Sequence, residues 1–305
     1  MSTTDIDSLA SRFPDRATRW VLGARTIELR QRPLVMGIVN VTPDSFSDGG
    51  AYHDPRAAAD RALEMAAAGA DLIDIGGEST RPYASPISLA DELGRVLAVL
   101  KLLAGKLTVP ISIDTTKAAV ARAAIDAGAQ IINDVSALTA DPAMIPLAVE
   151  KGVGVCAMHM LGTPASMQDD PRYDDVVSEV RDYLAGRRNA LIAAGIDRRK
   201  IALDPGIGFG KTHQHNLTLL AHCHELHALG CPLLVGHSRK GFIGKVLGDK
   251  EADRLAGTVG VALALARQGV QIIRVHDVGP VRQALLLFEA VGGIDGKPLE
   301  IGESK

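Results

Sequence analysis

Charged and amide side chains follow several short apolar segments of this chain. Asp114, Asn133 and Asp204 each end one such segment. If these segments are parallel strands, the three side chains point into one pocket and offer two carboxylates and one amide. A carboxylate can accept two parallel N–H bonds, so the set suits a flat heterocycle with an amino-pyrimidinone edge, with Lys240 as the partner of a ring carbonyl. Binding of Mg²⁺ by the two carboxylates is the alternative.

Arg81, Arg274 and His276 form a second, cationic group at the ends of two other apolar segments. In a closed barrel the segment that carries Arg274 and His276 lies next to the one that ends at Asn40. Arg offers a bidentate fork, His a switchable donor, and Asn40 a neutral oxygen for a Mg²⁺ ion that keeps most of its waters. The sequence therefore predicts a phosphate site here, and surface salt bridges are the alternative for each Arg taken singly.

Two further motifs are ambiguous from the sequence alone. The segment SRKG at 238–241 is predicted to begin a helix, whose free N–H groups and dipole favour an anion. Ordinary capping by Ser238 is equally compatible with this segment. Five histidines lack a one-face pattern with a carboxylate, so a solvated surface is preferred over a metal site. These are His213, His215, His222, His224 and His227.

A repeated phrase predicts the elements that position these residues. It consists of an Ala-rich helical run, a Gly, a short β-branched strand and a polar residue, as in AAAGADLIDIGG, DAGAQIINDV, EKGVGVCAMHM, AAGIDRRKIALDPG and ARQGVQIIRVHD. The Gly suits a helix C-cap, and the apolar run suits a strand buried on both faces. The predicted strands are Val35–Val39, Leu72–Ile75, Ile111–Ile113, Ile131–Ile132, Val153–Met158, Ile201–Leu203, Leu233–Val235 and Ile272–Val275. Predicted helices between them include Pro55–Ala68, Lys117–Ala127, Tyr173–Ala194 and Ala252–Gln268.

Alternating strands and helices without a linker favour an α/β fold, a single-domain (β/α)8 TIM barrel over 33–291. An open Rossmann-like sheet is the alternative, but no G-x-G-x-x-G follows the first strand. Residues 1–32 form an N-terminal extension with a hairpin at Trp20–Leu29 that turns at Gly23 and is expected to cover the bottom of the barrel. Residues 292–305 form a C-terminal tail.

Composition excludes several kinds of partner. Lys and Arg total 33 against 36 Asp and Glu, a net charge of −3, and only 3% of residues are aromatic. Without a basic block or a stacking platform, we expect no nucleic acid and no acidic membrane surface as partner. Cys156, Cys223 and Cys231 form no CxxC pair, and no segment reads as a signal peptide or membrane span. A soluble cytoplasmic protein is expected.

Eight motifs together resemble the dihydropteroate synthase family. They occur in the order typical of that family and cover about 33–290. The motifs are NVTPDSFSDGG (40–50), GGESTRP (76–82), IDTTK (113–117), IINDV (131–135), HM (159–160), LDPGIGFGK (203–211), GHSRKGFIG (236–244) and RVHDV (274–278).

The resemblance implies a TIM-barrel enzyme of folate synthesis. Such an enzyme joins 6-hydroxymethyl-7,8-dihydropterin diphosphate to p-aminobenzoate with Mg²⁺, giving 7,8-dihydropteroate and pyrophosphate, and it is a sulfonamide target and usually a homodimer. Carried over by motif, the pterin contacts are Asp114, Asn133, Met158, Asp204, Lys240 and Arg274. The diphosphate contacts are Asn40, Arg81, Arg274 and His276, with Asn40 also the metal contact, and the p-aminobenzoate contacts are Thr80, Pro82, Phe209, Ser238 and Lys240. Arg81, Lys240, Arg274 and His276 would be catalytic.

Three residues depart from the family pattern, namely Thr116, Leu161 and His237, the last expected beside the aminobenzoate site. We expect a dissociative displacement of diphosphate, with the loops at 43–50 and 80–86 closing to exclude water. A pterin-dependent corrinoid methyltransferase shares the barrel and the pterin acids but does not need the anion-binding motifs. A non-catalytic pterin-binding paralogue is the other alternative.

Overall fold

The protein folds around a closed barrel of eight parallel strands. The computed structural model describes residues 11–41, 54–81 and 83–299. The strand order is β8-β7-β6-β5-β4-β3-β10-β9, and a parallel bridge between Leu203 and Leu233 closes the ring. The strands are β3 Leu34–Asn40, β4 Leu72–Gly76, β5 Ile111–Asp114, β6 Ile131–Asp134, β7 Gly154–Met158, β8 Ile201–Asp204, β9 Leu234–Gly236 and β10 Ile272–Val275. The predicted TIM barrel is confirmed, and the open-sheet alternative is wrong.

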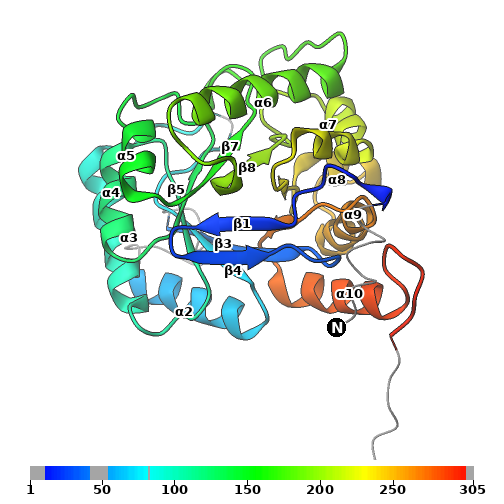
Figure 1. The fold of residues 1–305 in the computed structure, drawn as a ribbon, viewed down its shortest axis with the longest axis horizontal. Helices are drawn as coiled ribbons and strands as arrows, with labels where there is room; N and C mark the ends of the chain where they lie inside the picture. Colours follow the sequence, from blue (N-terminus) through cyan, green and yellow to red (C-terminus); the bar gives the residue numbers. More distant parts are fainter. Residues whose placement is uncertain (1–10, 42–53, 82, 300–305) are drawn as a thin grey trace, which may run out of the picture.

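Helices surround the barrel in a ring (Figure 1). The predicted helix at Tyr173–Ala194 begins at Val176 instead, because Asp175 is the N-cap and its carboxylate accepts the N–H groups of Val177 and Ser178. Within the described part of the chain, no helix is long and apolar enough to cross a membrane. The helices are α2 Pro55–Ala67, α3 Leu89–Leu103, α4 Ala118–Asp126, α5 Met144–Lys151, α6 Val176–Ala193, α7 His213–Ala221, α8 Gly241–Leu247, α9 Leu255–Arg267 and α10 Val278–Ala290, with short 3-10 helices η2 Arg198–Lys200 and η3 Cys223–Leu229.

The glycine of each repeated phrase ends or follows a helix in the left-handed backbone region. Its φ angle is +96° at Gly69, +110° at Gly128, +62° at Gly152, +104° at Gly195 and +74° at Gly269. A side chain with a Cβ is strained at such angles, so the chain turns back toward the barrel at these points with little steric cost. Gly152 is itself the C-cap of α5, as predicted, whereas the other four glycines lie one residue after the C-caps of α2, α4, α6 and α9.

Inside the barrel, the strands alternate between side chains that face the helices and side chains that face the barrel axis. Met36, Leu72, Ile131, Leu234 and Ile272 are fully buried and form one apolar cluster near the amino ends of the strands. Val35, Ile73, Ile113, Val155 and others belong to the larger cluster that packs against the helices. The next inward positions of β4, β6 and β10 are polar, namely Asp74, Asn133 and Arg274, and they belong to the site described below.

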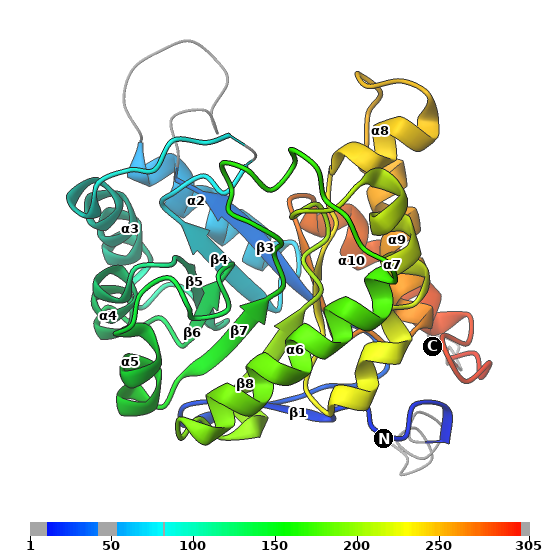
Figure 2. The same cartoon turned by 90° about the horizontal axis from the view of Figure 1, so that it is seen from above.

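The N-terminal hairpin closes the amino ends of the strands, as predicted. Strand β1 Arg19–Leu22 pairs antiparallel with β2 Arg25–Glu28. Trp20 and Leu22 belong to the apolar cluster inside the barrel, and Trp20 Nε1 donates to the Lys200 carbonyl at 3.0 Å. Figure 2 shows β1 lying across the end from which the barrel strands point away.

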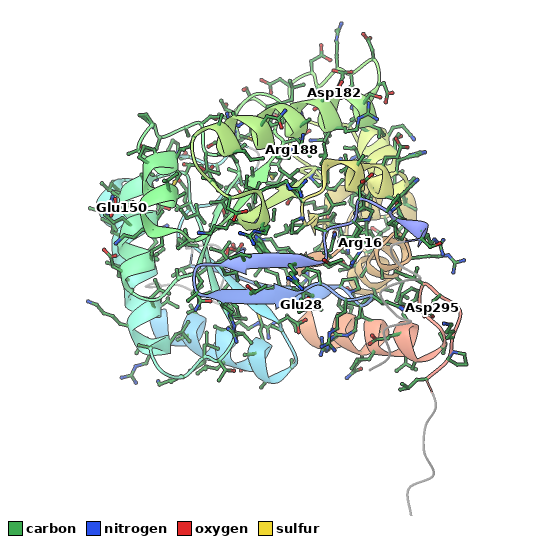
Figure 3. All side chains as sticks on the ribbon, viewed as in Figure 1. Arg16, Glu28, Glu150, Asp182, Arg188 and Asp295 are labelled. Carbon is green, nitrogen blue, oxygen red and sulfur yellow. The ribbon has the colours of Figure 1, made fainter. Side chains whose placement is uncertain are left out.

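Arg16 fastens this segment to the barrel. Its buried guanidinium donates to the carbonyls of Gly269, Leu29 and Arg30 at 2.7, 3.0 and 2.6 Å. Figure 3 labels Arg16 just before β1 and Glu28 on β2. Because three buried carbonyls depend on one side chain, Arg16 orders the start of the described chain against the barrel.

Candidate active site

Three predicted site residues lie together at the carboxyl ends of the strands. Asp114, Asn133 and Asp204 end or nearly end β5, β6 and β8 at inward positions, and each side chain is largely buried. Gly76 on the neighbouring strand β4 leaves room for Asp114, since a Cβ there would stand 3.3 Å from the Asp114 Cβ. The structure therefore places two carboxylates and one amide at inward positions at the same end of the barrel.

Arg274 is the cation at the centre of this pocket. Its Nε donates to Asp74 Oδ2 at 2.6 Å and its Nη2 to Asp114 Oδ2 at 2.7 Å. Burial and the nearby carboxylate of Asp74 raise the pKa of Asp114 to about 7, although Arg274 opposes this rise. Burial acts against the charge of Arg274, but the surrounding carboxylates raise its pKa above the usual value. Arg274 therefore supplies positive charge between carboxylates, which is the role that Mg²⁺ would have in the alternative interpretation of the sequence.

Asp74 is a site residue that the strand-end reasoning missed. Its side chain is fully buried, and Oδ2 accepts bonds from Arg274 and from Asn133 Nδ2, the latter at 3.1 Å. Its other oxygen, Oδ1, is buried without a hydrogen-bond partner among the described residues. Asp74 lies two residues before the end of β4, so it is hidden within the apolar run LIDIG. An acid at an inward position of a buried strand was the available signal.

Asp204 faces three cations and a glycine loop. Its Oδ1 accepts the N–H of Gly206 at 2.7 Å. Burial raises the pKa of Asp204, while that hydrogen bond and the charges of Lys240, Arg274 and Lys211 oppose the rise. Lys240 donates to the Ile207 carbonyl, and its Nζ stands 4.7 Å from the centre of the Phe209 ring. Burial lowers the pKa of Lys240 to about 8, with Asp204 acting in the opposite direction.

Met158 and Phe209 line the same region. Met158 ends β7 beside Asp204 in the strand register, and its Cγ lies 3.2 Å from the position that a Cβ would take at Gly206. The half-buried Phe209 ring lies on Lys240. An apolar side chain could therefore pack against one face of a flat ring bound to the acids of this pocket.

His276 and Ser238 meet at the other side of the pocket. The Ser238 hydroxyl accepts the backbone N–H of His276 at 3.3 Å and lies 3.1 Å from His276 Nδ1. Burial lowers the pKa of His276 to about 4, and Arg274, Arg239 and Arg81 add to this effect. His276 is therefore a neutral imidazole near pH 7. If the Ser238 hydroxyl donates to Nδ1, the proton of the ring is on Nε2 and is available to an anion.

In the segment after β9, the capping alternative for Ser238 is wrong, because Lys240 holds the N-cap position and helix α8 begins at Gly241. The side chain of His237 is fully buried, and its Nε2 lies 2.9 Å from the Thr258 carbonyl on helix α9. The chain turns at Arg239, whose φ is +58°, and this turn directs adjacent side chains to opposite sides.

The anion side of the site is more exposed than the heterocycle side. Arg81 is exposed and, within the described part of the chain, forms no ion pair. It is near enough to His276 to lower the pKa of that histidine. Thr80 is half-buried. Pro82 and the loop from Thr42 to Gly50 lie outside the described residues.

Asn40 ends β3 beside Gly76 and is half-buried. Its side-chain amide oxygen is a type of ligand that Mg²⁺ accepts. The described residues hold no group of three or more His, Cys, Asp or Glu side chains arranged for a metal.

Four of the five histidines near α7 have local partners. His215 closes a capping box with Thr212, and His222 Nδ1 lies 2.8 Å from the Thr218 carbonyl. His227 Nε2 lies 2.9 Å from the carbonyl of Gln268, and His224 lies beside the Gln268 side chain.

The fold and the pocket define a barrel protein built to hold a flat nitrogen heterocycle next to an anion. The sequence matches the family described as Pterin binding enzyme over residues 36–276, and the chain belongs to this family. The dihydropteroate synthase of Escherichia coli (strain K12) is 47% identical over 258 residues, which cover 85% of this chain and 91% of that protein.

Two solved structures show the same similarity. The Xanthomonas albilineans dihydropteroate synthase with 4-aminobenzoic acid is 46% identical, with a TM-score of 0.83 and coverage of 90% of this chain and 98% of that chain. The same bacterium's dihydropteroate synthase in complex with 7,8-dihydropteroate is 43% identical, with a TM-score of 0.80 and the same coverage.

Proposed function

We propose that this chain condenses 6-hydroxymethyl-7,8-dihydropterin diphosphate with p-aminobenzoate, releasing pyrophosphate and forming 7,8-dihydropteroate for folate biosynthesis. One observation carries the proposal. Asp114, Asn133 and Asp204 meet in one pocket, with Arg274 and Lys240 as the neighbouring cations. The relatives named above carry out this class of reaction under their printed names, and the matching motifs cover the same strand ends.

The acids of the pocket suit the edge of a pterin. A carboxylate at Asp204 can accept two parallel N–H bonds from the amino-pyrimidinone edge, and Asn133 can both donate and accept. Lys240 meets the ring carbonyl, and Met158 covers a ring face. Because these groups are already held by Arg274, Asp74 and the Gly206 N–H, little side-chain entropy is lost when the pterin binds.

The cationic side suits the leaving diphosphate. Arg81, Arg274 and His276 neutralise the charge that develops as the C–O bond breaks, and the electron-rich pterin stabilises the cationic methylene. His276 contributes an N–H donor from a neutral ring rather than a full charge. The arylamine nitrogen attacks the methylene after C–O cleavage toward pyrophosphate has advanced and then loses one proton, which makes the displacement dissociative in character.

Asn40 is the proposed protein ligand of Mg²⁺. Bound there with the diphosphate oxygens and water, the ion would neutralise part of the leaving-group charge. Arg81 and His276 act on the same leaving group from the other strands. The residues that flank p-aminobenzoate in this proposal are Thr80, Pro82, Phe209, Ser238 and Lys240. A sulfonamide that mimics p-aminobenzoate would compete for the same place.

We also propose a homodimer in the cytoplasm. Leu287 on α10 and Val291 just after it lie four residues apart in the sequence and are 63% and 73% exposed. Two exposed apolar side chains at this spacing are a candidate partner surface. Light scattering on the purified protein measures its mass, and a monomer at micromolar concentration would contradict the dimer. The free thiols of Cys156, Cys223 and Cys231 are all buried and fit a reducing compartment.

One assay separates this function from its alternatives. The protein is mixed with both substrates and Mg²⁺, and pyrophosphate and 7,8-dihydropteroate are measured over time. Equal amounts of both products are expected. A pterin-binding protein without turnover would bind the pterin but release no pyrophosphate, and a corrinoid methyltransferase would instead transfer a methyl group from a methylated pterin. Either result would contradict the proposed reaction.

A further inference from the structure

In the loop between β8 and α7, each carbonyl group from Gly206 to Gly210 accepts a hydrogen bond from a side chain. Lys211 donates to the carbonyls of Gly206 and Phe209 at 3.0 and 2.9 Å, and Lys240 donates to the carbonyl of Ile207. Gln168 donates to the carbonyl of Gly208 and Tyr173 to that of Gly210, both at 2.8 Å. Lys211 supplies two of these bonds although it lies outside the pocket. Its side chain is 2% exposed, which is unusual for lysine.

The surroundings of Lys211 Nζ favour an ammonium ion. Besides the two loop carbonyls, His159 Nδ1 lies at 2.8 Å and the His159 carbonyl at 3.4 Å. Burial lowers the pKa of Lys211 to about 7, and Asp204 opposes this change. Burial and the charge of Lys211 also lower the pKa of His159, to about 3, so its ring is neutral and can accept. Only an ammonium has three N–H groups for such a set of acceptors.

Lys211 also joins the loop to the segment after β7. The loop lies so close to this segment that a Cβ at Gly206 would overlap the His159 carbonyl oxygen, and one at Gly210 would overlap the Leu161 backbone. The φ angles of Gly206 and Gly210 are +67° and +60°. The backbone can make this approach because glycine occupies these positions, and the ammonium then satisfies carbonyls on both sides of the contact.

This loop places two groups of the proposed aminobenzoate site. Phe209, whose carbonyl is bound by Lys211, carries the ring that lies against Lys240. Ile207 provides the carbonyl that receives the Lys240 ammonium. A shift of the loop would therefore move both Phe209 and Lys240.

We propose that Lys211 is a positioning residue of the condensation reaction. Its buried ammonium orders the 206–210 loop and thereby positions Phe209 and Lys240 for p-aminobenzoate. Its positive charge also stabilises the ionised carboxylate of Asp204. Lys211 does not touch either substrate in this arrangement. The proposal rests on the function proposed above.

The charge of Lys211 gives a measurable effect on pH dependence. Lys240, Arg274 and Lys211 present positive charge to Asp204. The thiols of Cys156 and Cys223 lie near Asp204, and burial raises their pKa. Removal of one of three cations makes the Asp204 carboxylate easier to protonate, so pterin binding should fail at a higher pH than in the parent protein.

The test compares three variants of the full chain. Lys211→Met removes the charge and the donors, Lys211→Gln retains an N–H donor without the charge, and Tyr173→Phe is the matched control that removes one loop bond from another side chain. For each we would measure kcat, the KM for p-aminobenzoate, and the Kd for the pterin diphosphate from pH 5 to pH 8.

For Lys211→Met we expect the KM for p-aminobenzoate to rise about 10-fold, because about two hydrogen bonds to the loop are lost. The acid midpoint of pterin binding should move up by about half a pH unit, with pterin affinity at pH 8 nearly unchanged. Lys211→Gln should show the same pH shift with a smaller KM change, and it keeps the test decisive if Lys211→Met does not fold. Tyr173→Phe should show no pH shift.

Two results would overturn the inference. One is unchanged KM and midpoint in the Lys211 variants. The other is an equal loss of pterin and aminobenzoate binding at every pH, which would indicate a structural role alone. Failure of the proposed function is distinguishable from both, because the parent protein itself would then release no pyrophosphate.

Discussion

The two ends of the barrel differ in the kind of side chain that the same eight strands bury there. At the amino ends, the hairpin residues Trp20 and Leu22 pack on apolar side chains such as Met36 and Ile272. At the carboxyl ends, Asp114 and other buried polar groups meet around Arg274. Burial of apolar surface at the amino ends stabilises the fold, whereas burial of the charged groups at the carboxyl ends costs free energy.

This difference separates stability from function within one fold. The carboxyl ends of parallel strands converge on one mouth, where loops of any sequence can be attached. The amino ends need only be covered. Four predictions test whether the separation is real, from the largest expected effect to the smallest.

Trp20→Ala should destabilise the protein by about 3–5 kcal/mol, because it removes a fully buried ring from the closed end. The kcat and both KM values of the folded protein should not change. The free energy of unfolding is measured by urea denaturation. Trp20→Phe is the control, which retains a ring and loses the bond to the Lys200 carbonyl. A loss of turnover in the folded Trp20→Ala protein would show that the two ends are coupled.

Asp204→Asn should weaken pterin binding about 100- to 1000-fold, because a buried carboxylate close to several positive charges, the acceptor proposed for the pterin edge, is lost. Titration calorimetry with the pterin diphosphate measures this. Asp134→Asn is the matched control, since Asp134 is also buried at a strand end but bonds to Ser136 at 2.6 and 2.7 Å. Unchanged pterin affinity in Asp204→Asn would remove Asp204 from the site.

His276→Ala should slow the chemical step about 10- to 100-fold, because a donor to the developing diphosphate charge is lost. Pterin affinity should fall by much less. Single-turnover rates at saturating substrate separate the two quantities. Because the pKa of His276 is lowered to about 4, the rate of the parent protein should not follow the titration of an ordinary histidine near pH 6.5. A rate that does follow it would contradict a neutral His276.

Acidification should weaken pterin binding about 8-fold between pH 7.5 and pH 6, because the pKa of Asp114 is raised to about 7. A carboxylate with such a pKa becomes protonated as the pH falls through that value. The ionised form that binds is present above pH 7 and is lost below it. The Kd of the pterin diphosphate measured across this range tests the effect. In Asp114→Asn, which should bind more weakly, this part of the pH dependence should disappear.

Several parts of the site could be read from the sequence because their signals are local. A Gly between a helical run and an apolar run predicted the helix ends, and all five such glycines have positive φ. Residues at strand ends, such as Asp114 and Asp204, point into the mouth of any parallel barrel. Neither inference needs knowledge of distant contacts.

Other parts depend on contacts between distant segments. Asp74 looks like a core position in LIDIG, and its role emerges only because Arg274 comes from a strand 200 residues later. Lys211 stands just before helix α7 in the sequence, and its burial depends on contacts with the loop and with His159. His237 and Ser238 are neighbours in sequence, yet one contacts Thr258 and the other His276.

By itself, the sequence determined the alternation of helices and strands, the closed barrel and the set of polar residues at its mouth, because hydrophobic period and backbone preference act over a few residues. Only the tertiary structure decided which carboxylate faces which cation, which histidine turns toward the site, and which lysine is buried. These outcomes depend on burial and on charges brought together from distant strands, and electrostatic free energies are set by distance in space and not by distance along the chain.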